Sequence, residues 1–167
     1  MKLNLGCGKR PLEGFDGVDK KEGEGVKYVH DLIKPLPFKD NEVDGIYASH
    51  IIEHFWWDKV FDVVKDWYRV LKPGAQIDIW TVDFDILVYH FMNHEDKDFM
   101  QTMKGLNWRL YSTNRYDGDA HHCIFNYRLL GSMLMNAGFK QIERINSTEY
   151  PFKPMHDGIN LGVRAVK

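Results

Sequence analysis

The residues best suited to acid–base chemistry in this chain of 167 residues are histidines that stand beside carboxylates. His50, Glu53 and His54 are spaced at i, i+3 and i+4, which places them on one face of a helical turn. Because a histidine exchanges its proton near neutral pH, such a group can act as a general base. The same pattern can also bind a metal ion, or merely close a turn.

A second group of this kind lies much later in the chain. His121 and His122 follow Asp117 and Asp119, at the end of a long stretch rich in aromatic residues, methionine and histidine. Long connections in compact domains often form binding loops, although a polar turn at Gly118 is the structural alternative. The sequence predicts no bound metal, and the candidate catalytic residues are His50, His54, His121 and His122.

A third group is suited to binding a ligand rather than to moving a proton. A short strand, residues 2–5, runs into Gly6-Cys7-Gly8, and a second strand, at about residues 15–18, ends at Asp19. Glycines after a strand let the backbone approach a ligand that any Cβ atom would exclude. An acidic residue that ends the next strand can bind the two hydroxyls of a ribose.

Three segments together resemble the class I S-adenosylmethionine (SAM)-dependent methyltransferases: LNLGCG, GVD and DLIKPLPFKDNEVDGIYASHIIEHF. The resemblance is specific over residues 2–73 and rests on element order after that. It implies that the glycine turn lies against the methionine part of SAM, Asp19 against the ribose, and Asp31 beside the adenine. The cofactor-binding residues that it implies are Leu5, Gly6, Cys7, Gly8, Asp19, Lys20, Asp31, Leu32, Ser49 and His50.

The connection between the glycines and Asp19 departs from the usual pattern. In nucleotide-binding folds a helix separates them, and the acid lies about twenty residues downstream. Residues 9–14 leave no room for that helix. A dinucleotide needs the helix because its pyrophosphate binds at the helix N-terminus, whereas SAM has no phosphate. The short loop therefore argues against NAD and is compatible with SAM.

Composition and charge narrow the classes of partner. The net charge is −2 and the sequence pI is about 6.4, so nothing indicates binding to nucleic acid. Two cysteines make no disulfide framework, and no apolar run approaches the length of a membrane span. We expect one cytoplasmic domain spanning residues 1–167, with no nucleic-acid or membrane partner.

Hydrophobic spacing and turn residues predict the elements. Val60, Val64 and Trp67 recur at helical spacing before Pro73, while Asn126 can cap a later helix that Gly138 ends. Strands are expected at residues 2–5, 15–18, 26–29, 43–48, 75–82, 140–145 and 159–166, and helices at 57–71, 84–91, 96–108 and 127–136.

Alternation within the strands predicts how the sheet is covered. Apolar and polar residues alternate in the first, fifth and last strands, which indicates one buried and one wet face. The expected fold is an α/β, Rossmann-like class I methyltransferase sheet, mostly parallel with an antiparallel seventh strand. It lacks the N-terminal helices and carries its helices mainly on one face. A homodimer covering the other face is the less favoured alternative, since the side chains Lys2, Asn4, Gln76, Asp78 and Arg164 are polar.

The function that these features predict is methyl transfer from SAM, with S-adenosylhomocysteine as product, to a small-molecule or sugar-containing acceptor. The expectation of a sugar-containing acceptor rests on similarity to small methyltransferases of surface-glycan pathways. Residues 83–125 are expected to form an insertion that closes over the site, and Asp83 and Asp85 either contact substrate or cap a helix. The alternatives are a SAM-binding domain without transfer activity and an enzyme using decarboxylated SAM. The sequence does not show the pair of aspartates that is typical of enzymes using decarboxylated SAM.

Overall fold

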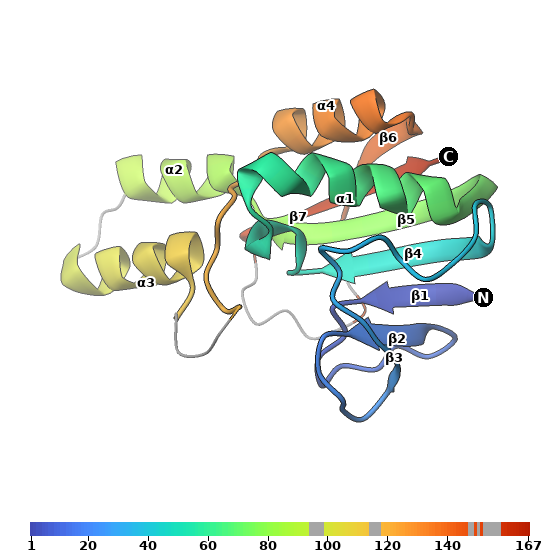
Figure 1. Cartoon of the computed structure of the whole chain (residues 1–167). Helices are drawn as coiled ribbons and strands as arrows, with labels where there is room; N and C mark the ends of the chain where they lie inside the picture. Colours follow the sequence, from blue (N-terminus) through green and yellow to red (C-terminus); the bar gives the residue numbers. More distant parts are fainter. Residues whose placement is uncertain (94–98, 114–117, 147–148, 150, 152–157) are drawn as a thin grey trace.

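One seven-stranded sheet organises the chain in the computed structural model, which describes residues 1–93, 99–113, 118–146, 149, 151 and 158–167. The strand order is β3-β2-β1-β4-β5-β7-β6 (Figure 1). The strands β1 to β5 are parallel, and β7 is antiparallel to both of its neighbours, which confirms the predicted sheet. The strands are β1 (Lys2–Leu5), β2 (Asp16–Asp19), β3 (Val26–Val29), β4 (Val43–Ser49), β5 (Leu71–Val82), β6 (Lys140–Ile145) and β7 (Asn160–Val166).

The helices begin and end close to the predicted residues. Asn126 caps the last helix through a hydrogen bond from the backbone N–H of Leu129, and Gly138 ends it in the left-handed conformation. The fifth strand begins at Leu71 rather than at residue 75, because Leu71 is already extended and buried and pairs with Val43. Residues 96–98 of one predicted helix lie outside the described residues. The helices are η1 (Ile52–His54, a single 3₁₀ turn), α1 (Trp57–Val70), α2 (Phe84–Met92), α3 (Phe99–Tyr111) and α4 (Tyr127–Ala137).

The helices α1 and α4 cover a single face of the sheet (Figure 1). The apolar residues of the central strands, such as Leu3, Ile77 and Val163, form one buried cluster with the inner sides of these two helices. This packing explains the alternation in the sequence, since only one face of each strand needs apolar side chains.

The polar residues of the opposite face have the environment that the alternation predicts. Lys2 and Gln76 are exposed, and the Arg164 guanidinium donates to both carboxylate oxygens of Asp78 at 2.8 Å. Asn4 is buried, but its side-chain amide donates to a backbone carbonyl at 3.0 Å. Among the described residues no helix packs over this face, so the prediction of one helix-covered face is confirmed.

Part of this second face is nevertheless shielded from solvent. Tyr47, Trp80 and Ile145 form a small buried cluster there, against which Leu12 and Phe15 pack. The loop that replaces the usual first helix therefore covers a patch of the sheet that the alternation alone predicted to be wet.

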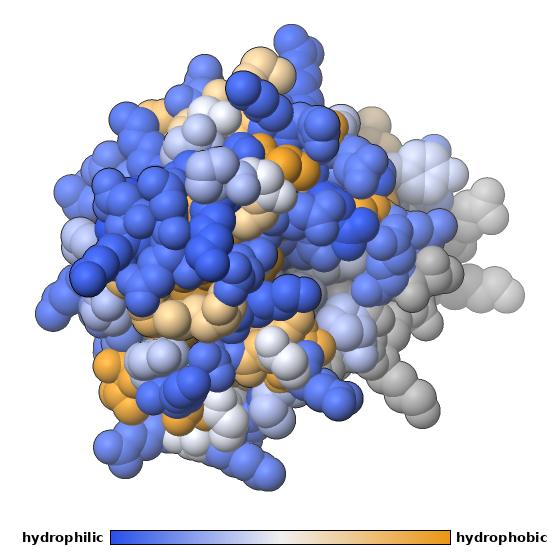
Figure 2. Space-filling model, turned by 90° about the vertical axis from the view of Figure 1, so that its right-hand side faces the viewer, coloured by the Kyte–Doolittle hydropathy of each residue, from blue (hydrophilic) through white to orange (hydrophobic). Residues whose placement is uncertain are grey.

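The two ends of the parallel strands have different surroundings. The helices α2 and α3 lie beyond the carboxyl ends (Figure 1). The amino ends face the viewer in Figure 2, where the surface is mainly hydrophilic and apolar residues form only small separate patches. In the described part of the chain, no helix has both the length and the apolar character needed to cross a bilayer.

Candidate active site

Strand order brings the predicted cofactor residues into one row. The strands β3, β2, β1 and β4 are adjacent and parallel, so the residues that follow them lie along the same edge of the sheet. Asp31, Asp19, the turn Gly6–Gly8 and the pair Ser49–His50 lie at or just after the ends of these strands, in that spatial order. Ligands of open α/β sheets bind at this edge.

The glycine turn is tied to the second strand by backbone hydrogen bonds. The N–H of Gly6 donates to the carbonyl of Val18 at 2.8 Å, and Gly6 has a φ of +66°. A Cβ atom on Gly6 would lie 2.7 Å from Cγ1 of Ile51, whereas one on Gly8 would meet nothing within 4 Å. Gly6 therefore lets the segment after β4 approach the turn, and Gly8 keeps an open space beside it.

The carboxylate of Asp19 lies directly against this turn. Its Oδ2 accepts a hydrogen bond from the N–H of Gly8 at 2.8 Å, and its Oδ1 accepts one from the N–H of Lys21 at 3.1 Å. Each carboxylate oxygen has about two acceptor sites, so both oxygens can still accept from a ligand hydroxyl. An acceptor pair beside an open glycine turn fits the ribose and methionine parts of SAM.

The remaining predicted cofactor residues differ in what they offer. The Leu5 and Leu32 side chains are buried in the main core, so only their backbone groups can reach a ligand, and Lys20 is exposed. Burial and the charge of Asp19 both raise the pKa of the Cys7 thiol, so this buried group stays protonated. The carboxylate of Asp31 accepts from the N–H of Ile33 at 3.3 Å.

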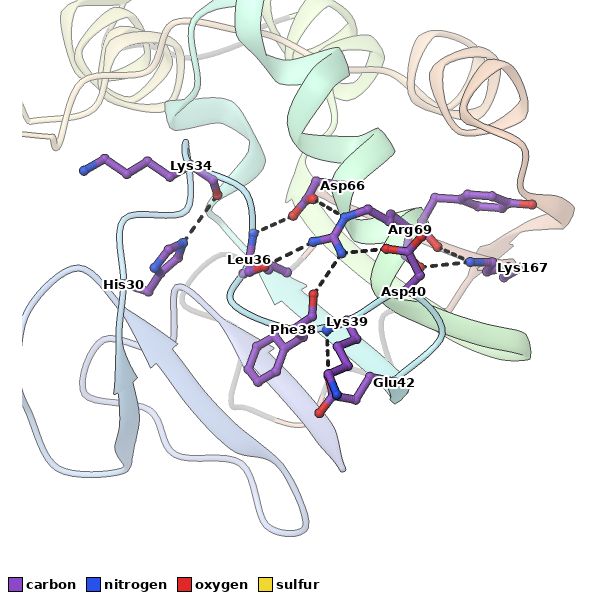
Figure 3. A network of polar contacts seen from close by, with 11 residues as sticks. His30, Lys34, Leu36, Phe38, Lys39, Asp40, Glu42, Asp66, Arg69 and Lys167 are labelled. Carbon is purple, nitrogen blue, oxygen red and sulfur yellow. Dashed lines mark hydrogen bonds and ion pairs between the residues drawn. The ribbon is translucent and has the colours of Figure 1, made fainter.

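A polar network holds the loop after Asp31 against α1 (Figure 3). The Arg69 guanidinium donates to the backbone carbonyls of Leu36 and Phe38 at 3.1 and 2.8 Å, and to Asp66 at 2.7 Å. Asp66 in turn accepts from the N–H of Leu36 at 2.7 Å. This network fixes the path of the loop that begins at the predicted adenine residue.

His50 and Glu53 form a hydrogen-bonded pair at the end of β4. Nδ1 of His50 donates to Oε1 of Glu53 over 3.0 Å, and His50 has a φ of +51°, a strained value for a residue other than glycine. Glu53 is 2% exposed. Burial alone raises the pKa of its carboxyl, but the hydrogen bond from His50 and the attraction of the His50 ring oppose burial and lower the pKa to about 2. Its other oxygen, Oε2, is buried without a hydrogen-bond partner among the described residues.

His54 does not share this interaction, because it faces a different segment. Its Nδ1 donates to the carbonyl of Ala120 over 3.1 Å, and its ring meets that of His121 edge to face, with the centroids 4.7 Å apart. Nδ1 of His121 donates to the carbonyl of Arg109 over 2.9 Å. Burial lowers the pKa of the His54 imidazole, which favours its neutral form.

The segment that carries His121 is attached to the segment after β4 at several points. The N–H groups of His122 and Cys123 both donate to the carbonyl of Glu53, at 2.8 and 3.1 Å. The ring of His122 stacks on Trp56 with the centroids 3.6 Å apart. These contacts bring the candidate histidines together, but His54 and His121 touch each other rather than facing across an open space. Asp117 lies outside the described residues.

A cavity lies between this attachment and the helices α2 and α3. It has room for about one water molecule and is partly open to solvent. Glu53 and His121 contribute to its wall, while no residue of β1 or of the glycine turn does. The lining residues are Glu53, Thr81, Val82, Phe84, Leu87, Arg109, Leu110, His121, Cys123, Ile124 and Phe125.

Several residues around the site have roles that the sequence left open or did not indicate. Asp83 is buried, caps α2 through the N–H of Asp85 and binds Arg144 at 2.9 Å, so it acts in structure rather than in substrate contact. Thr81 and Arg109 line the cavity, although no motif singles them out. Among the described residues, no group of three or more His, Cys, Asp or Glu side chains is placed to hold a metal ion.

Comparison with known sequences identifies a family match. Residues 13–79 match the family described as a methyltransferase domain. Demethylmenaquinone methyltransferase of Listeria monocytogenes is 25% identical over 156 residues, which cover 84% of this chain and 62% of that protein. 24-Methylenesterol C-methyltransferase 2 of Arabidopsis thaliana is 24% identical over 127 residues, covering 76% of this chain and 31% of that protein. The chain thus matches less than two thirds of the length of these relatives.

Solved structures share the fold over almost the whole chain. A SAM-dependent methyltransferase of Archaeoglobus fulgidus superposes with a TM-score of 0.61 at 18% identity, covering 99% of this chain and 85% of that one. The 1,6-didemethyltoxoflavin-N1-methyltransferase of Burkholderia thailandensis, solved with its substrate and S-adenosylhomocysteine, superposes with a TM-score of 0.61 at 16% identity. It is covered over 70% of its length, and this chain over 99%.

Proposed function

We propose that this chain, which belongs to the class I SAM-dependent methyltransferases, transfers a methyl group from SAM to a small-molecule acceptor. The observation that carries the proposal is the contact between the glycine turn and the acid of the next strand. Asp19 accepts from Gly8 at 2.8 Å, beside a glycine with open space around it. Both features lie at the carboxyl edge of the sheet, where the family binds SAM.

The residues of this edge bind and orient the reactants. SAM supplies an electrophilic methyl group whose sulfonium is already a good leaving group. Asp19 would accept hydrogen bonds from the ribose hydroxyls, Asp31 would lie beside the adenine, and the Ser49–His50 segment beside the sulfonium. Holding the nucleophile in line with the methyl carbon and the sulfur is then the main task of the protein.

The acceptor would bind on the side of the sheet edge where α2, α3 and the small cavity beside Glu53 lie. This cavity lies at the carboxyl ends of β4 and β5, next to the segment that would border the sulfonium. Two relatives are named for a quinone and a sterol, which supports a small molecule as the acceptor. A sugar-containing acceptor is the narrower alternative that the sequence suggested.

Replacement of Asp19 tests the SAM site. Asp19→Ala removes an ionised partner of the ribose hydroxyls, and a hydrogen bond to a charged group contributes roughly 1.5–3 kcal/mol. We therefore expect calorimetry to show SAM affinity reduced by about tenfold or more. Asp16→Ala is the matched control, since Asp16 lies at the other end of the same strand and pairs with the exposed Lys27. Equal SAM affinity in the parent and in Asp19→Ala would exclude the assigned site.

Transfer is tested separately from binding. Incubation with methyl-labelled SAM and a panel of phenols, amines and sugars should label at least one acceptor. Tight SAM binding without labelling of any acceptor would instead favour a SAM-binding domain without transfer activity.

A further inference from the structure

We propose that the buried charge of Glu53 makes the cofactor site bind the cationic SAM more tightly than its uncharged product, S-adenosylhomocysteine. This inference rests on the proposed function, because it assigns a specificity-determining residue to the same site. The two ligands differ only by a methyl group and the positive charge that it places on sulfur. A carboxylate that attracts this charge favours loading of SAM and release of the product.

The segment that carries Glu53 lies against the glycine turn. A Cβ atom on Gly6 would lie 2.7 Å from Cγ1 of Ile51, so the side chain two residues before Glu53 contacts the turn. Nδ1 of His50 lies 3.0 Å from Oε1 of Glu53. If the sulfonium lies beside Ser49 and His50, as proposed above, the Glu53 carboxylate is linked to that position through the His50 ring.

The carboxyl of Glu53 is ionised although it is buried. Only 2% of the residue is exposed, and the hydrogen bond from His50 opposes burial and helps to lower the pKa to about 2. The carboxyl therefore carries its charge at neutral and alkaline pH. Because water is excluded from it, its attraction for a nearby cation is weakened less than that of an exposed carboxylate. Such an attraction acts at a distance and needs no contact between Glu53 and the ligand.

Histidines are the partners of this charge. His50, His54 and His121 act on Glu53 electrostatically, and among the described residues no lysine or arginine forms an ion pair with it. Histidine side chains are ordinarily neutral at about pH 8.5. Under that condition the described residues do not balance the Glu53 charge by an ion pair, and a cationic ligand is attracted to it.

The attraction is strong enough over the distances involved. At an effective dielectric constant of about 20, two opposite unit charges attract enough for an approximately tenfold change in affinity out to about 12 Å. A histidine ring with a 3.0 Å hydrogen bond on one side spans well under that distance. Taking the sulfonium out of water opposes the preference for SAM. The change in the preference when the charge is removed therefore isolates the contribution of Glu53.

Calorimetry on the full chain at about pH 8.5 tests the inference without turnover. We expect the parent to bind SAM more tightly than S-adenosylhomocysteine. Glu53→Gln removes the charge, keeps the shape and leaves an oxygen that can accept from His50. It should lower the ratio of the two affinities by about tenfold, with little change in the affinity for S-adenosylhomocysteine.

Two further variants separate charge from position. Glu53→Asp keeps the charge on a shorter side chain, so it should retain more of the ratio than Glu53→Gln does. Glu143→Gln removes an exposed charge on β6 and should keep the ratio of the parent. A substitution that merely loosens the turn weakens both ligands alike, since they share every other group. The ratio therefore does not respond to a purely structural role.

Salt provides a test that needs no variant. In about 1 M salt the Debye length falls to about 3 Å, which screens exposed charges but has little effect on a buried one. We therefore expect the ratio of the parent to persist in high salt.

Three results would overturn the inference, and two of them need only the parent protein. These two are a parent that binds S-adenosylhomocysteine as tightly as SAM or more tightly, and a preference for SAM that disappears in high salt. The third is an unchanged ratio in a folded Glu53→Gln protein. A parent that binds neither ligand contradicts the proposed function itself, so the two failures are distinguishable.

Discussion

Two glycines of the same turn should respond very differently to the same substitution. Gly6 and Gly8 both have positive φ values, +66° and +52°, so an alanine at either position costs roughly 1–2 kcal/mol of backbone energy. Only at Gly6 would the new methyl group also collide, 2.7 Å from Cγ1 and 2.9 Å from Cβ of Ile51. Overpacking of this kind adds typically about 1–3 kcal/mol.

We therefore expect Gly6→Ala to destabilise the protein by about 2–5 kcal/mol and Gly8→Ala by about 1–2 kcal/mol. The entropy that alanine removes from the unfolded chain is the same in both variants, so it cancels in the comparison. The free energy of unfolding is measured by urea titration with tryptophan fluorescence, using the parent as reference.

A third substitution separates strain from collision. Ile51→Gly removes the three atoms that would lie nearest to a methyl group at position 6, so the difference between the two alanine variants should largely disappear in that background. If Gly6→Ala and Gly8→Ala are equally destabilising, or if their difference persists with Ile51→Gly, the close approach of these two segments is not what requires glycine at position 6.

Two further predictions concern the cofactor loop and pH. Arg69→Lys should destabilise the protein by about 1–2 kcal/mol in urea titration, because a single ammonium cannot bind the Leu36 and Phe38 carbonyls together, while Arg128→Lys on the exposed face of α4 should be neutral. Burial lowers the pKa of His54 in the folded state, so its contribution to stability is complete above about pH 6.5, the unfolded-state pKa, and is lost as the pH falls through the folded-state pKa. The melting temperature should thus fall between pH 7.5 and 5, and less so in His54→Gln; an equal fall in that variant would contradict this origin.

Much of the fold could be predicted because its signals are local. The cap at Asn126, the glycine at 138 and the apolar period of α1 all act within a few residues, and the helices begin and end near the predicted positions. The alternation in β1, β5 and β7 reports burial on one side of each strand, so it predicted a sheet with helices on a single face. The boundary at Leu71 was missed, since its burial and its pairing with Val43 belong to the packed sheet.

The cofactor-binding residues at the carboxyl ends of the strands could also be predicted from the sequence. The resemblance to the methyltransferases assigned the glycine turn and Asp19 to neighbouring parts of one ligand, and the structure places β1 and β2 side by side. The turn at Gly6 and the acid Asp19 were therefore expected together before any distance was measured. Their 2.8 Å contact through Gly8 shows how close the two segments come.

The acceptor side depends on tertiary structure. The contact between His54 and His121 joins segments far apart in the chain, and no local period can report such an approach. The burial of Glu53 arises because the segment containing His122 and Cys123 packs over it from elsewhere in the chain. The sequence alone predicted which side chains could move a proton, while the path of the chain decided which of them share a cavity, since burial and contact between distant residues are properties of the packed whole.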